Sequence, residues 1–146
     1  MNDLAALVWS VVIALAPALA AAQAVPLVAE NAWASNVPGS DTAAVYLTLR
    51  NTGAQPVVVV GVRSPIANQV MMHETSIVGG QSQMRPYDRL VLAPGQALTF
   101  APGGLHIMLS GLKHGIAPGD KVPLILALAN GATVTIAAAV RPLGAQ

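Results

Sequence analysis

The chain has 146 residues, of which 54% are hydrophobic and 9% are charged, with a formal net charge of +1 and no cysteine. Its length fits one domain with its own core. The small net charge and the lack of a run of Lys or Arg give no electrostatic basis for nucleic-acid binding. The lack of cysteine excludes a disulfide framework and a thiolate ligand.

Residues 1–24 are predicted to form a secretory signal peptide. Positions 4–16 are apolar except for one serine, and a proline and small residues follow, with a preferred cleavage site after Ala24. The mature chain, 25–146, would then be a single periplasmic domain without a membrane span. An uncleaved membrane anchor is the alternative, because the same segment is just long enough to cross a bilayer.

The mature chain has the pattern of short strands separated by turns. Residues 43–51 alternate apolar and polar side chains, which is typical of a half-buried strand, and the β-branched run 56–63 predicts a strand that is buried on both faces. Further strands are expected at 68–77, 81–87, 97–101, 103–112, 121–130 and 132–140, the last two joined by an Asn-Gly turn. About eight or nine strands without an amphipathic helix predict an all-β, antiparallel sandwich or Greek-key barrel.

One of these strands separates its side chains by chemistry. Leu105, Ile107 and Leu109 would point to one face, while His106 and Met108 would point to the other. Because the three aliphatic residues occupy the core face, the histidine and methionine are candidates for binding a ligand.

A second His/Met pair lies earlier in the chain. Met71 and His73 would share a strand face, whereas Met72 has the opposite phase and is predicted to pack in the core. Thioether sulfur is a soft ligand that selects Cu(I), and imidazole is a compatible partner. A blue-copper centre would need a cysteine, so the pattern indicates that Cu(I) is held rather than used for rapid electron transfer.

The spacing of these residues is specific. His73, Met84, His106 and Met108 form the motif H-x10-M-x21-H-x-M, which resembles that of the periplasmic copper chaperone family PCu(A)C. Further segments similar to that family are "AW" at 32–33, "TAAVYLTLRNTG" at 42–53, "HET" at 73–75, "MRP" at 84–86, "APGGLHIMLSGLK" at 101–113 and "GDKVPL" at 119–124. The resemblance covers essentially the whole mature chain.

The resemblance implies a cupredoxin-like Greek-key β-barrel in which His73, Met84, His106 and Met108 bind Cu(I) near the surface. It also implies delivery of copper to the CuA centre of cytochrome c oxidase subunit II, alongside a Sco-type thiol protein. Met71 is a candidate accessory ligand that the motif does not require. Some members have a second, Cu(II)-binding site in a His- and Met-rich tail, which is not expected here because neither residue follows position 114.

Other functions fit the sequence less well. No G-x-S-x-G motif frames a serine, and Glu74 would point away from His73, so the chain is expected to be a carrier and not an enzyme. His114 is expected to be solvated in a loop. Two alternatives stay open: a periplasmic copper-buffering or resistance protein, and a structural extracytoplasmic β-sandwich with an incidental His/Met cluster.

Overall fold

The computed structural model describes residues 24–144, so positions 1–23 of the predicted signal peptide lie outside the described residues. Every regular element in this range is a β-strand. The strands are β1 (Leu27–Ser35), β2 (Thr42–Asn51), β3 (Val57–Arg63), β4 (Ala67–Val78), β5 (Gln81–Tyr87), β6 (Leu90–Leu92), β7 (Ala97–Phe100), β8 (Leu105–Leu112), β9 (Lys121–Leu128) and β10 (Thr133–Val140). Within 24–144, no helix has the length and apolar character needed to span a membrane.

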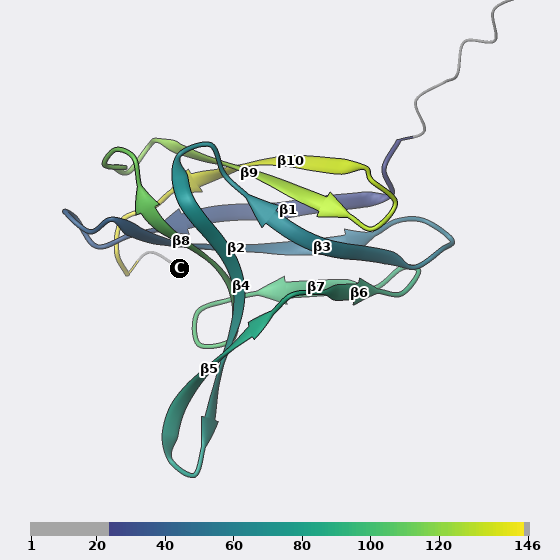
Figure 1. Ribbon diagram of the computed structural model, residues 1–146, viewed down its shortest axis with the longest axis horizontal. Coiled ribbons are helices and arrows are strands. Elements are labelled where there is room, and N and C mark those ends of the chain that lie inside the picture. The colour runs from purple at the N-terminus through teal and green to yellow at the C-terminus, as the bar shows by residue number, and fades with distance from the viewer. Residues whose placement is uncertain (1–23, 145–146) are drawn as a thin grey trace, which may run out of the picture.

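The strands form one continuous sheet that curls over itself (Figure 1). The strand order is β5-β4-β8-β2-β1-β10-β9-β3-β6, and β7 pairs with the far end of β2. In Figure 1, β9 and β10 lie on one side and β6 and β7 on the other, while the β4–β5 hairpin extends away from both. The predicted all-β sandwich is confirmed.

The core lies inside the curled sheet and is filled by alternate residues of several strands. In β2, Val45, Leu47 and Leu49 are buried, and their neighbours are half-buried. In β8, Ile107 and Leu109 are completely buried, as predicted for the core face of this strand. Burying one aliphatic side chain stabilises a fold by about 1.5–3 kcal/mol, so these residues fix the rotation of β8 about its own axis.

The prediction for residues 56–63 is wrong in one respect. Val57 and Val59 are buried, but Val58 is half-buried and Val60 is exposed, so β3 is covered on one face only. The reason is that β3 belongs to one layer of the folded sheet, so that only its inner face, with Val57 and Val59, meets the core.

Two strands were not expected from the sequence. β1 contains a bulge between Glu30 and Trp33, where Asn31 has a positive φ of 53°, and this extra residue interrupts the alternation that identifies a strand. β6 has only three residues. β1 also pairs in parallel with β10, which departs from the predicted wholly antiparallel arrangement.

Candidate metal centre

Strand register places the four motif residues on one face of the sheet. His73 in β4 lies directly opposite His106 in β8, and Met108 lies opposite Met71 in the same strand pair. On the other side of β4, Met84 of β5 lies opposite Thr75. Opposite residues share a face, and so do alternate residues of a strand, so the donors of three strands face the same way.

The His106 ring is held by the turn that precedes β8. Its Nδ1 lies 3.0 Å from the carbonyl oxygen of Gly104, which also accepts a hydrogen bond from the Thr75 backbone N–H at 3.0 Å. A carbonyl can only accept, so Nδ1 carries the proton and the free lone pair of the neutral ring is on Nε2. Metal-binding histidines are commonly oriented by this kind of contact.

The His73 ring is buried beside His106. The two ring centroids are 5.7 Å apart with an interplanar angle of 62°, and each residue is 8% exposed. Burial lowers the pKa of His73 below 6.5, and the charge that His106 carries when protonated lowers it further. Among the described residues His73 Nδ1 has no hydrogen-bond partner, although it is buried. An unpaired buried nitrogen is costly unless something binds it, which fits a metal ligand.

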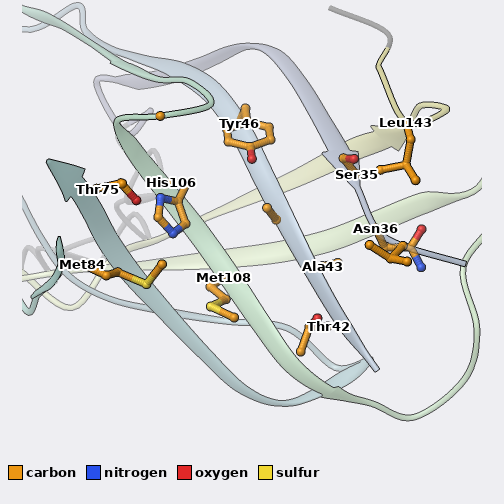
Figure 2. Close-up of a pocket in the computed structure, with 13 residues that line it drawn as sticks. Ser35, Asn36, Thr42, Ala43, Tyr46, Thr75, Met84, His106, Met108 and Leu143 are labelled. Atoms are coloured by element: carbon orange, nitrogen blue, oxygen red, sulfur yellow. The ribbon is translucent and has the colours of Figure 1, made fainter. Parts of the chain in front are cut away.

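The two thioethers lie beside a groove of about 360 Å³ (Figure 2). Met84, His106 and Met108 lie along one side of the groove, and the Met84 side chain extends from β5 toward the other two. Met84 is 56% exposed, whereas Met108 is half-buried. The other lining residues are Ser35, Asn36, Val37, Thr42, Ala43, Ala44, Tyr46, Thr75, Gly103 and Leu143. None of the lining residues is Asp, Glu, Lys or Arg.

Other predicted positions are placed as follows. Met72 is buried in the core, as expected, and His114 is exposed. Met71 is half-buried on the face of the motif residues, where Gln69 donates to its sulfur at 3.6 Å. Glu74 lies on the face opposite His73, as its phase predicted, and accepts a hydrogen bond from Tyr87.

The burial of the motif residues was not expected from the sequence in detail. Both histidines are buried, and of the four motif residues only Met84 is widely exposed, although Met84, His106 and Met108 all line the groove. The orienting contacts from the Gly104 carbonyl and the Thr75 backbone were also not predicted. The Pro-Gly-Gly segment at 102–104 is typical of a turn, and Gly103 has a φ of 80°.

The donor set is chemically soft. Two imidazoles and two thioethers share the face, and within the described residues no three His, Cys, Asp or Glu side chains form a group that could hold a metal. Neutral thioether and imidazole donors favour Cu(I) over harder cations.

Comparison with known proteins agrees with this picture. Residues 27–140 match the family model described as "Putative lipoprotein LpqE-like". The chain is 35% identical over 112 residues to "Putative lipoprotein Lxx21020" of Leifsonia xyli subsp. xyli (strain CTCB07), covering 76% of this chain and 67% of that protein.

Solved structures share the fold. The copper-bound PCuAC domain of PmoF2 is 25% identical with a TM-score of 0.66, covering 80% of this chain and 93% of that one. Apo-DR1885 of Deinococcus radiodurans is 31% identical with a TM-score of 0.64, covering 97% and 96%. Its Cu(I) form is 32% identical with a TM-score of 0.59, covering 82% and 81%. Through the LpqE-like sequences that it matches and the structures that it resembles, the chain belongs to the PCu(A)C family.

Proposed function

We propose that this protein is a Cu(I) carrier whose ligands are His73, Met84, His106 and Met108. The observation that carries the proposal is the placement of two imidazoles and two thioethers on one face by the register of β4, β5 and β8. The copper-bound relatives support the same cargo. Met71 is an accessory candidate beside Met108.

The donor chemistry suits transfer rather than permanent capture. Thioethers bind Cu(I) without a charge, so an acceptor that offers thiolates would bind the ion more strongly and could remove it by ligand exchange. The exposed Met84 is the donor that an incoming partner would reach first. The buried histidines would be released last, because they are covered on more sides.

Methionine substitutions test the ligand assignment. We expect Met84→Leu and Met108→Leu each to weaken Cu(I) binding at least about tenfold in a competition assay with a chromogenic chelator, since leucine keeps the volume but lacks the sulfur. Met72→Leu is the matched control because this sulfur lies in the core on the opposite face. Unchanged binding in both site variants would exclude the site.

Delivery is proposed as the cellular role. The destination would be the CuA centre of cytochrome c oxidase subunit II, and a Sco-type thiol protein would be a partner in the transfer. Cells lacking the protein should lose oxidase activity when copper is scarce. Loss of copper tolerance alone would instead support the buffering function.

Export to the periplasm is part of the proposal. The names of the relatives, which call them lipoproteins, support an exported chain. These 146 residues include no cysteine and so offer no thiol for a lipid. Mass spectrometry of the protein recovered from the periplasm should give a chain that begins at Val25.

A further inference from the structure

The strand that carries Met84 is attached to the rest of the fold through one neighbouring strand. β5 lies at the end of the strand order and pairs only with β4. The β4–β5 hairpin extends away from β9 and β10 on one side and from β6 and β7 on the other (Figure 1). Six of its seven residues are exposed, Met84 among them. The position of the Met84 sulfur therefore depends on contacts within the hairpin.

Tyr87 makes two side-chain contacts that bear on the position of β5. It is the one residue of β5 that is half-buried, and its ring packs against the hydrophobic core. Its hydroxyl donates to Glu74 Oε2 at 2.9 Å, and in the described part of the chain this is the only hydrogen bond between side chains of β4 and β5. A bond to a carboxylate is about twice as strong as one between neutral groups.

This contact lies behind the donor face. Tyr87 is opposite Met72 in the register, so it shares the core-side face of β4 with Glu74, while His73 and Met84 lie on the other face. The tyrosine can therefore hold the hairpin without touching the groove.

The backbone ladder between β4 and β5 runs without a break from the Met72–Tyr87 pair to the Val78–Gln81 pair and contains one proline. Pro86 lies opposite His73 and has no N–H to donate. The bond to Glu74 also raises the pKa of Tyr87 above 10.0. A phenol is already protonated at neutral pH at its ordinary pKa, so the hydroxyl is a hydrogen-bond donor there.

We propose that Tyr87, through its hydrogen bond to Glu74, is a positioning residue that holds Met84 over the histidine pair. The inference rests on the proposed function, because it assigns to Tyr87 the task of placing one of the Cu(I) ligands. Without the bond, β5 would pivot on its ladder with β4, and Met84 would spend less time within reach of His106 and Met108.

A double-mutant cycle tests the coupling of Tyr87 to Met84. We expect Tyr87→Phe to weaken Cu(I) binding about tenfold. This is the lower end of the loss of metal affinity that follows when a residue that orients a metal ligand is substituted. In a Met84→Leu background the same substitution should change the affinity less than about twofold, because the ligand to be positioned is gone.

Ser82→Ala is the matched control, since it removes a hydroxyl from an exposed residue of the same strand. In the metal-free protein, methyl relaxation of Met84 should show greater mobility in Tyr87→Phe than in Ser82→Ala, with the thermal midpoint of both close to that of the unaltered protein. This readout separates a loosened hairpin from a loss of fold.

The remaining outcomes overturn the inference in distinguishable ways. Equal weakening by Tyr87→Phe in both backgrounds would show that the tyrosine acts by another route. No weakening by Tyr87→Phe, with Met84→Leu still defective, would reject the positioning role and leave the Cu(I) site intact. No weakening by Met84→Leu would reject the proposed ligand set and the inference together.

Discussion

At the scale of single residues, the environment of His73 links the site to stability. Burial disfavours its charged form, and a charged His106 adds repulsion, so its pKa in the folded protein lies below the value of 6.5 in the unfolded chain. Between the two pKa values the unfolded chain binds a proton that the folded chain does not. The free energy of unfolding should therefore fall as the pH falls from about 6.5 through the lowered pKa.

Urea unfolding of the metal-free protein at about pH 7.5 and about pH 5.5 measures this loss. His73→Gln should show a smaller loss than the unaltered protein, because the titrating group is absent. His114→Gln is the control, since that side chain is exposed in a loop. An identical pH dependence in all three proteins would contradict the assignment of the loss to His73.

The burial of His73 and His106 is a feature that strand periodicity alone could not predict. The phase of the strand predicted which face His73 and His106 would occupy, and this is confirmed by the register. Their burial was not predictable, because it depends on the pairing of β4 with β8, two strands that are far apart in the sequence. Periodicity describes one strand and contains no information about what covers it.

At the scale of elements, the turn before β8 orients the His106 ring through the Gly104 carbonyl oxygen. Gly103 has a φ of 80°, which alanine adopts only at a cost of about 1–2 kcal/mol. We expect Gly103→Ala to lower the free energy of unfolding by about 1 kcal/mol and to weaken Cu(I) binding, because the strained turn would move the Gly104 carbonyl away from the ring.

Gly104→Ala provides the control within the same turn. A Cβ at Gly104 would lie 3.6 Å from the Ala101 carbonyl oxygen, an ordinary contact, and its φ lies outside the left-handed region. Stability should change by less than about 0.5 kcal/mol. Equal effects of the two substitutions, measured by chemical unfolding and chelator competition, would show that the conformation at Gly103 is not what matters.

The elements also differ in how well sequence patterns reveal them. β2 and β8 were predicted because an unbroken alternation matches a sheet with one covered face. β1 was missed because the bulge at Asn31 shifts the alternation by one residue. The position of Met84 depended on pairing across the Gly79-Gly80 turn, and strand phase alone does not give the register of a hairpin.

At the scale of the whole molecule, the proposed ligands come from strands with very different support. β8 lies inside the sheet between β4 and β2, while β5 is an edge strand with one neighbour. Copper bound by Met84, His106 and Met108 would connect the edge strand directly to the interior of the sheet. Metal binding should therefore stabilise the molecule unevenly, with the largest local effect on β5.

A ligand that binds only the folded state stabilises it by about 2.7 kcal/mol when its free concentration is 100 times its Kd. We expect Cu(I) to raise the free energy of unfolding by about this amount and, in hydrogen exchange, to slow the β5 amides more than those of β9, which has no proposed ligand. In Met84→Leu the residual donors still tie β4 to β8, so a smaller global gain should remain while the added protection of β5 disappears. Protection that rises equally in β5 and β9, or that persists in β5 without the Met84 sulfur, would mean that copper does not connect the hairpin to the sheet through this residue.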